Sequence, residues 1–229
     1  MAPASVVRYL LVLILTIVSS SGIADQSRCP GKFIHDEIPN IHYDEEICFT
    51  AFAVLYSYVN KGPVISAEHL TAEMVKAAET FPRRNAFHVE QQIPDTAQSS
   101  SSDYVYSGYD QGHMTPAGDM PDSTTRHESF SMANMTPQLP KLNRIAWRKT
   151  EAFVRKLALQ DGEVWVITGA LFSNEHIGNG VSVPTLIYKA VSSQSGQQVF
   201  VGDNTSGVVT SLSIRDFHTQ YSIAPFARQ

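Results

Sequence analysis

The stretch YDQGHMTPAGDM, residues 109–120, brings two acids and a histidine together with two glycines and a proline. It neither alternates as a half-buried strand does nor follows the 3.6-residue period of an amphipathic helix. Glycine and proline indicate irregular backbone that brings side chains to a surface. Because an imidazole titrates near neutral pH, His113 is a candidate general base.

A second set of candidates lies on a helix that we predict from Pro140 to about Gln160. Proline suits the first turn of a helix, the residues after it are good helix formers, and Asp161-Gly162 ends it. The expected core-facing stripe consists of Leu142, Ile145 or Ala146, Phe153 and Leu157.

Asn143, Trp147 and Glu151 are spaced by four residues, so we expect them to share one face of this helix. Glu151 is the only acid from 141 to 156. The basic residues around it are Lys141, Arg144, Arg148, Lys149, Arg155 and Lys156. This composition fits an ordinary solvated helix face, and it also fits a local positive patch for a polyanion.

Amide and carboxylate oxygens, with retained waters, suit Mg²⁺ or Ca²⁺ rather than zinc. A histidine base and a hard metal can together cleave a phosphodiester, because the base activates water and the metal stabilises the leaving oxygen. His113, Asn143 and Glu151 therefore fit a metal-assisted hydrolase, while an ordinary solvated helix face stays the alternative for Asn143 and Glu151.

The elements that must position these residues are mostly strands. We predict strands at 48–59, 129–134, 163–171, 183–193 and 197–203. Residues 66–79 fit either a short helix or a strand end and a loop, and 211–220 fit a helix capped by Ser211 or Ser213. Because strands outnumber helices and mostly follow one another, the prediction is an α+β fold with a mainly antiparallel central sheet and flanking helices.

Residues 1–24 fit a signal peptide. Arg8 precedes a ten-residue apolar core, and Gly22-Ile23-Ala24 fits a cleavage site. The alternative is an uncleaved N-terminal anchor, although the core is shorter than the roughly 20 residues that a transmembrane helix needs. We therefore expect an exported protein, periplasmic or secreted, with residues 25–229 as a single domain.

If the protein is exported, its two cysteines meet an oxidising compartment, and its net charge is that of the chain without the signal peptide. In an oxidising compartment Cys29 and Cys48 would pair, and the alternative is two free buried thiols. The formal net charge is −5, and removal of Arg8 with the signal peptide makes it −6. A general electrostatic binder of nucleic acid would be basic, so any polyanion site must be a local patch. The sequence NTS at Asn204 fits a glycosylation acceptor.

These residues resemble the DNA/RNA non-specific endonucleases of the ββα-metal nuclease superfamily. The family's Asp-Arg-Gly-His motif with a following proline is similar to DQGHMTPAGD. Its Asn-x-x-Pro-Gln segment, followed by a second Asn, a Trp and a Glu, is similar to NMTPQLPKLNRIAWRKTE. The resemblance covers most of residues 48–226, and two motifs in the correct order and spacing make it specific.

The resemblance implies a role for each matching residue. His113 would be the general base, and Asn143 would be the one direct protein ligand of Mg²⁺, with Mn²⁺ or Ca²⁺ as substitutes. Glu151 would orient metal-bound water, and Asp110 and Asn134 would support the site. The strand ending at His113, the strand at 129–134 and the helix from Pro140 would form the ββα-metal motif.

The implied activity is sequence-non-specific hydrolysis of DNA and RNA, by a protein without stable membrane association once the signal is removed. The oligomeric state stays open. The chain departs from the family at Gln111, where an arginine usually grips the scissile phosphate, and glutamine cannot make that bidentate contact. Arg83 or Arg84 could supply part of the missing charge. The alternative is a catalytically weakened nucleic-acid-binding protein on the same fold.

Overall fold

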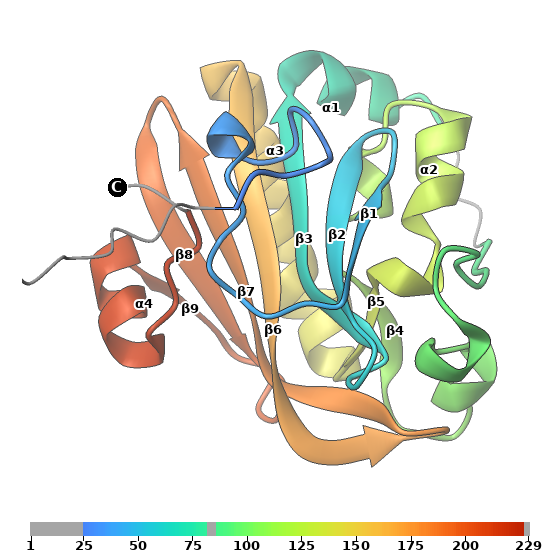
Figure 1. Cartoon of the computed structure of the whole chain (residues 1–229). Coiled ribbons are helices and arrows are strands. Elements are labelled where there is room, and N and C mark those ends of the chain that lie inside the picture. Colours follow the sequence, from blue (N-terminus) through green and yellow to red (C-terminus); the bar gives the residue numbers. More distant parts are fainter. Residues whose placement is uncertain (1–24, 82–85, 227–229) are drawn as a thin grey trace, which may run out of the picture.

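The structure, a computed structural model, describes residues 25–81 and 86–226. The predicted signal peptide, Arg83 and Arg84 lie outside the described residues. A seven-stranded antiparallel sheet forms the centre of the molecule (Figure 1). In spatial order its strands are β1 (Glu45–Cys48), β2 (Phe52–Ser57), β3 (Gly62–Thr71), β6 (Glu163–Ile177), β7 (Val181–Ser193), β8 (Gly196–Asp203) and β9 (Val209–Leu212).

The remaining elements surround this sheet. The α-helices are α1 (Ala72–Ala78), α2 (Ser123–Ser129), α3 (Arg148–Asp161) and α4 (Ile214–Tyr221), and a π-helix (Leu142–Trp147) leads directly into α3. A separate two-stranded sheet pairs β4 (Asp110–His113) with β5 (Met135–Gln138). The short 3-10 helices are η1 (Ile34–Asp36), η2 (Asp95–Ala97), η3 (Ser101–Tyr104), η4 (Ala117–Asp119) and η5 (Met132–Asn134). The predicted α+β class with a mainly antiparallel sheet is confirmed.

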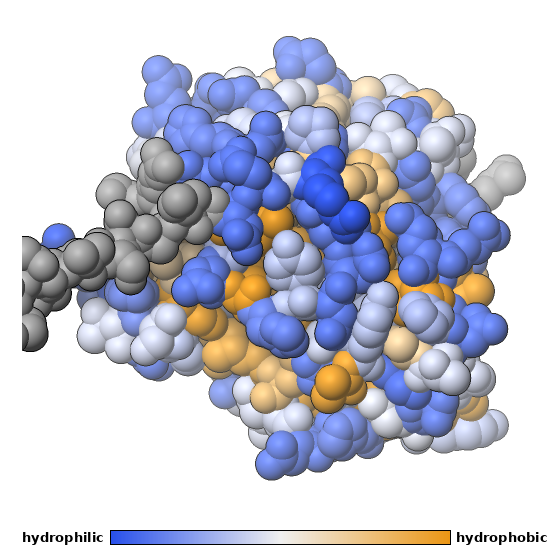
Figure 2. Space-filling model, viewed as in Figure 1, coloured by the Kyte–Doolittle hydropathy of each residue, from blue (hydrophilic) through white to orange (hydrophobic). Residues whose placement is uncertain are grey.

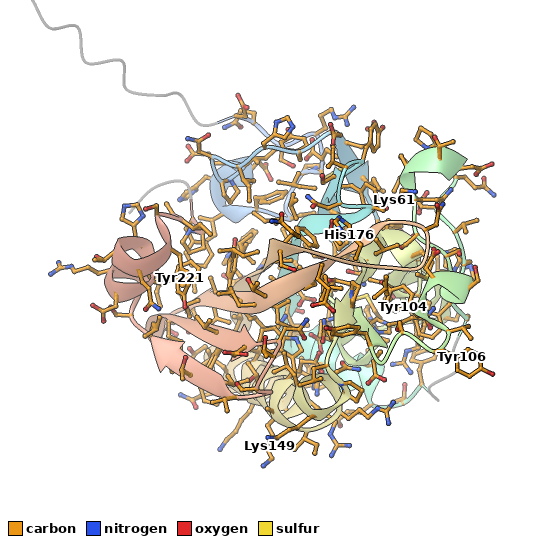
Figure 3. All side chains as sticks on the ribbon, turned by 90° about the horizontal axis from the view of Figure 1, so that it is seen from below. Lys61, Tyr104, Tyr106, Lys149, His176 and Tyr221 are labelled. Carbon is orange, nitrogen blue, oxygen red and sulfur yellow. A yellow bond between two sulfur atoms is a disulfide. The ribbon has the colours of Figure 1, made fainter. Side chains whose placement is uncertain are left out.

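The central sheet is covered on both faces. The N-terminal segment before β1 crosses one face, and α3 lies against the opposite face, as the two perpendicular views agree (Figures 1 and 3). On the first face Phe33 packs with Ile65, Tyr188 and Phe217 in one buried cluster. Because both faces are buried, the central strands are almost continuously apolar rather than alternating.

Two of the buried clusters on the opposite face position the helix and the β4–β5 pair. One joins α1 and α3 to the middle of the sheet through residues such as Val75 and Val154. The other surrounds Trp147 beneath the π-helix and includes Met114, directly after β4. The sheet therefore supports the helix and the β4–β5 pair from the same side. The N-terminal side, seen in Figure 2, is mostly hydrophilic with scattered hydrophobic areas.

Several expected boundaries need correction. Residues 129–134 are not a strand, because Ser129 ends α2 and Met132–Asn134 is a 3-10 helix; the strand follows at Met135–Gln138. Residues 66–79 divide between the end of β3 and α1. The strand predicted at 163–171 continues to Ile177, where its hairpin with β7 begins.

The other predictions of elements fare better. Strands occupy the predicted 183–193 and 197–203 segments, and the 48–59 run contains the end of β1 and all of β2. Ser213 caps α4, since its side chain accepts a hydrogen bond from the Asp216 amide. None of the helices in the described part of the chain is long and apolar enough to cross a membrane.

The predicted disulfide is present between Cys29 and Cys48, with Cα atoms 5.2 Å apart. It joins the N-terminal segment to β1, at the edge of the central sheet. The bridge therefore attaches the segment that covers one sheet face to the sheet itself.

Candidate active site

The β4–β5 pair and the helix after it form one compact unit. His113 pairs with Met135 and Asp110 with Gln138 across the two strands. The Gln138 side chain lies on Gly112, where an added Cβ would come within 2.0 Å of its Cδ atom. Only glycine fits there, so the close approach explains the glycine of the DQGH motif. The predicted ββα arrangement is present, with β5 in place of residues 129–134.

The helix is continuous from Pro140, as predicted, but its first turns are π-helical over Leu142–Trp147. The wider π turn changes which residues face the sheet. Trp147 is fully buried in the core, while Asn143 and Glu151 face a cavity. The prediction that Trp147 shares their face is therefore wrong.

The same change of register overturns part of the expected core stripe. Leu142 is buried as predicted, and Ala146 and Leu157 pack partly buried against the core. Ile145, the alternative to Ala146, and Phe153 are exposed instead. In their place Thr150, Val154 and Ala158 face the core.

A cavity of about 320 Å³ lies between the end of β4 and the helix. Its lining is formed by His113, Pro116, Ala117, Gly118, Arg126, Asn143, Arg144, Arg148, Glu151 and Arg155. The described lining thus contains four arginines and one carboxylate, in a chain of net charge −5. Three of those arginines come from the segment predicted to be a positive patch.

His113 is held at the end of β4 by aromatic rings. Its imidazole packs edge-on against Phe130, with ring centroids 4.8 Å apart, and Phe87 lies at 6.0 Å. Only 8% of the residue is exposed. The ring therefore has a fixed orientation, which a positioned acid or base requires.

Asn143 and Arg144 both contact Asp110 at the start of β4. The Asn143 Nδ2 donates to Asp110 Oδ2 over 2.9 Å. The Arg144 Nε donates to Oδ2 over 2.8 Å and its Nη2 to Oδ1 over 2.5 Å. An ionised carboxylate only accepts hydrogen bonds, so this contact fixes the amide orientation and leaves Asn143 Oδ1 as an available oxygen ligand.

Asp110 stays ionised because of these donors. Partial burial acts to raise the pKa of its carboxyl group, but the hydrogen bonds from Arg144 and Asn143 and the charge of Arg144 outweigh it and lower the pKa. The predicted supporting role of Asp110 thus has a physical basis: it orients the asparagine beside it.

Asn134 is fully buried and does not line the cavity. Its Oδ1 accepts from the Thr115 amide at 2.9 Å, and its Nδ2 donates to the Thr115 and Ser129 carbonyls. It therefore ties the chain after His113 to the end of α2. That position fits the supporting role predicted for it.

Gln111 is turned away from the cavity lining that the structure describes. Its Nε2 donates to Ser101 Oγ at 2.9 Å and contacts Met132 Sδ at 3.7 Å. Ser101 belongs to the polar stretch that precedes the motif. The Gln111 side chain thus contacts Ser101 and Met132 and is not among the described residues that line the cavity.

A buried polar layer beneath the cavity escaped the sequence analysis. The Arg155 Nη1 donates to Asp119 Oδ1 over 2.7 Å. Lys189 on β7 is 1% exposed and donates to Thr168 and to the carbonyl of Met114. A lysine within the apolar run TLIYKAV was the available signal, since a buried lysine needs partners.

Glu68 on β3 completes this layer and is also 1% exposed. Burial and then the carboxylate of Asp119 raise its pKa well above the usual range. Burial raises the pKa of Asp119 as well, although Arg155 opposes the shift. The sheet therefore presents buried acids and cations directly under the helix that carries Glu151.

Asn204, the predicted glycosylation acceptor, has a structural role instead. It is 3% exposed, and its Nδ2 donates to the carbonyls of Pro137 and Pro184. Its Oδ1 accepts from the Leu139 amide at 2.8 Å. The amide nitrogen that would carry a glycan is thus enclosed, and Asn204 fixes the connection between β5 and the helix.

The donor set of the cavity suits a hard cation that keeps several waters. No group of three or more His, Cys, Asp or Glu that could hold a metal occurs among residues 25–81 and 86–226. What the cavity offers is the oriented amide oxygen of Asn143 and the carboxylate of Glu151. Mg²⁺ is bound in this way, through one or two protein oxygens and water.

Known proteins resemble this chain in sequence. Nuclease C1 of Cunninghamella echinulata var. echinulata is 30% identical over 165 residues, covering 66% of this chain and 66% of that protein. The mitochondrial nuclease EXOG of Homo sapiens is 29% identical over 161 residues, covering 64% of this chain and 44% of that protein. The chain therefore spans between about two fifths and two thirds of the length of these relatives.

A solved structure resembles the fold. A chain from the crystal structure of the EndoG/EndoGI complex, reported for the mechanism of EndoG inhibition, matches with a TM-score of 0.68 and 27% identity. The match covers 82% of this chain and 86% of that one. The sequence profile of DNA/RNA non-specific endonuclease matches residues 29–225, which include every described residue of the cavity. The chain belongs to the DNA/RNA non-specific endonuclease family.

Proposed function

We propose that this protein is a metal-dependent endonuclease that hydrolyses phosphodiester bonds of DNA and RNA with little sequence preference. One observation supports this most directly. A cavity in an acidic chain is lined by His113, Asn143 and Glu151 together with four arginines. A polyanionic phosphate backbone is the ligand that such a lining would attract.

His113 would act as the general base. Its ring is fixed against Phe130 and lines the cavity, so it can accept a proton from a water molecule placed beside the phosphate. The arginines would stabilise the negative charge that develops on the phosphate oxygens. Asp110 would hold Asn143 and Arg144 in place without contacting the reacting atoms.

The family is metal-dependent, and we propose Mg²⁺ as the ion, with Mn²⁺ or Ca²⁺ as substitutes. Asn143 Oδ1 would hold it, and Glu151 would accept hydrogen bonds from surrounding water. When bound, the ion supplies Lewis-acid stabilisation of the leaving oxygen. The support for this assignment is the fixed amide orientation at Asn143.

Low sequence preference follows from the kind of groups in the cavity. Guanidinium groups contact phosphates, which carry no sequence information, whereas specificity requires contacts to base edges. DNA and RNA would both be substrates, since both present the same diester.

We also propose that the protein is exported. The disulfide between Cys29 and Cys48 supports this, because such bridges persist in oxidising compartments. Residues 1–24 would be the signal peptide, and the protein would leave the membrane when they are removed.

A nicking assay tests the activity. Supercoiled plasmid and a structured RNA are incubated with wild type and with His113→Gln, in Mg²⁺ and in EDTA. We expect cleavage of both substrates by wild type in Mg²⁺ alone. Binding without cleavage in any divalent metal would instead support the alternative, a catalytically weakened nucleic-acid-binding protein with Gln111 at the motif position.

A further inference from the structure

The cavity has arginines, but none of them comes from the motif position. Gln111, where the family's phosphate-gripping arginine is expected, donates to Ser101 and is absent from the described lining. In an active nuclease, the charge that an arginine at position 111 would supply has to come from another residue. This inference deepens the proposed function and rests on it.

Two of the four lining arginines are held by partners that are themselves part of the buried structure. Arg126 donates to the backbone carbonyls of Phe81, Ala78 and Met120 and is 8% exposed. Arg155 pairs with the buried Asp119, and its side chain is 24% exposed. Both hold the walls of the cavity together, so neither can leave its partners for a phosphate without breaking that support.

Arg144 is placed differently. Its side chain is 68% exposed, and Asp110 takes its Nε and one Nη2 hydrogen. A guanidinium has five N–H donors, so three remain on the edge away from Asp110. The carboxylate thus fixes the guanidinium plane, as a preorganised anion contact requires.

Arg144 also lies beside the other reactive groups. It is adjacent in sequence to Asn143, and both contact the same carboxylate and line the same cavity as His113. Arg148, about one turn further along the helix, lines the cavity and forms no hydrogen bond or ion pair with any residue that the structure describes. The ion pair between Asp110 and Arg144 has no net charge, and Arg148 therefore supplies net positive charge beside it.

We propose that Arg144, oriented by Asp110, grips the scissile phosphate in this protein and replaces the arginine missing at position 111. In this protein the phosphate-binding guanidinium would therefore come from the helix that faces β4, rather than from β4 itself. Arg83 and Arg84, which the sequence analysis expected to supply part of this charge, lie outside the described residues, so that expectation stays a prediction.

The test uses Arg144→Gln and Arg144→Lys, with Arg215→Gln as the matched control. Arg215 is an exposed arginine on α4, which lies apart from the cavity (Figure 1). With Mg²⁺ we expect Arg144→Gln to lower kcat/KM on duplex DNA about 10- to 100-fold, the range for loss of one charge-assisted contact. Arg144→Lys should recover only part, because an ammonium lacks the planar fork. Arg215→Gln should stay near wild type.

A second readout does not depend on catalysis. Binding of a short duplex is measured in EDTA over a range of KCl concentrations. Loss of one phosphate contact should reduce the slope of log K against log[KCl] by about 0.9 in Arg144→Gln and leave it unchanged in Arg215→Gln. A merely structural role for Arg144 would lower activity and melting temperature without changing this slope.

The transposed variant, Gln111→Arg with Arg144→Gln, gives the sharpest comparison. It returns the arginine to the motif position, so we expect it to recover activity that Arg144→Gln alone has lost. Equal behaviour of Arg144→Gln and Arg215→Gln in rate and slope would overturn the inference. If wild type cleaves nothing with any divalent metal, the proposed function fails, and the EDTA slope still decides whether Arg144 contacts phosphate.

Discussion

Asp110 shows how one carboxylate can orient two neighbouring groups of a site. Its carboxylate receives the Asn143 amide on one oxygen and the Arg144 guanidinium across both. These bonds decide which atom of Asn143 faces the cavity, and they keep the pKa of Asp110 low. Asn143 and Arg144 are thus both oriented by the same carboxylate.

The first prediction at this scale concerns the base. His113→Gln should lower kcat on duplex DNA by about 10²–10⁴-fold, the usual contribution of a positioned acid or base. Glutamine retains bulk against Phe130, so the variant should stay folded, whereas His113→Ala would also lose packing. Steady-state kinetics and a thermal melt separate the two effects. A His113→Gln enzyme with wild-type kcat would remove His113 from the mechanism.

The second concerns the metal. Asn143→Ala should abolish Mg²⁺ binding detected by calorimetry and most cleavage. Glu151→Ala should weaken each by about 10- to 100-fold, as is typical for groups that act through water around an ion. Gln160→Ala, exposed at the end of the same helix, is the control. Undiminished Mg²⁺ affinity in Asn143→Ala would show that the ion lies elsewhere.

The candidate residues for chemistry were easier to predict than the buried polar residues beneath them. His113, Asn143 and Glu151 stand in a recognisable spacing, and the structure brings all three to one cavity. Lys189 and Glu68 were missed because the groups beside them, such as Met114 and Asp119, come from segments far away in the sequence. Such pairing depends on tertiary contacts that no local pattern contains.

At the scale of elements, the helix explains why part of the sequence reading failed. The face pattern predicted from the sequence assumes α-helical geometry throughout, and the π turn at Leu142–Trp147 departs from it. Trp147 turns into the core, while Asn143 and Glu151 stay at the cavity. The start at Pro140 was predictable, because proline chemistry is local. The π turn was not, since packing against the sheet stabilises it.

The ion pair under the helix gives the third prediction. Arg155→Met leaves the carboxylate of Asp119 buried without its cation, which should cost about 3–5 kcal/mol of unfolding free energy. Because burial already raises the pKa of Asp119, protonation should reduce this loss at low pH. Urea denaturation at pH 5 and pH 8 measures the difference. A loss below 1 kcal/mol at both values would mean that the pair is dispensable.

Glu68 on β3 gives the fourth prediction. Its pKa is raised in the folded protein, so the native state binds more protons than the unfolded chain above the unfolded pKa of about 4.3. Stability should therefore fall as the pH rises from that value through the folded pKa. Glu68→Gln removes this dependence and should be more stable than wild type near pH 8.

Glu73→Gln, on the exposed face of α1, serves as the control for Glu68→Gln. Its stability should follow the wild-type curve from pH 4 to pH 8 in parallel denaturation series. If wild type and Glu68→Gln show the same pH dependence, Glu68 does not titrate in the way that its burial implies.

At the scale of the whole molecule, the central sheet separates the disulfide-linked N-terminal segment from the cavity. The N-terminal segment, α4 and the disulfide lie with one face of the sheet, and α3, the β4–β5 pair and the cavity lie with the other (Figure 1). An acidic chain can thus present a locally cationic cavity, because its excess of acids is distributed elsewhere on the surface. Strand-rich composition was enough to predict this class of fold, but not which face would hold the site.

This separation gives the last prediction. The bridge between Cys29 and Cys48 joins residues 19 apart in sequence. Closing a loop of this size should contribute on the order of 3 kcal/mol to stability. For a domain of this size, the variant Cys29→Ala/Cys48→Ala should then melt roughly 6–12 °C below wild type. Its kcat at 25 °C should be unchanged, because the sheet stands between the bridge and the cavity. Melting curves and cleavage rates of the folded variant test both statements.

A folded variant with wild-type melting temperature, or two alkylatable thiols in freshly exported wild type, would show that the bridge does not stabilise the native protein. A folded variant that has lost its activity would show instead that the two faces of the sheet are coupled.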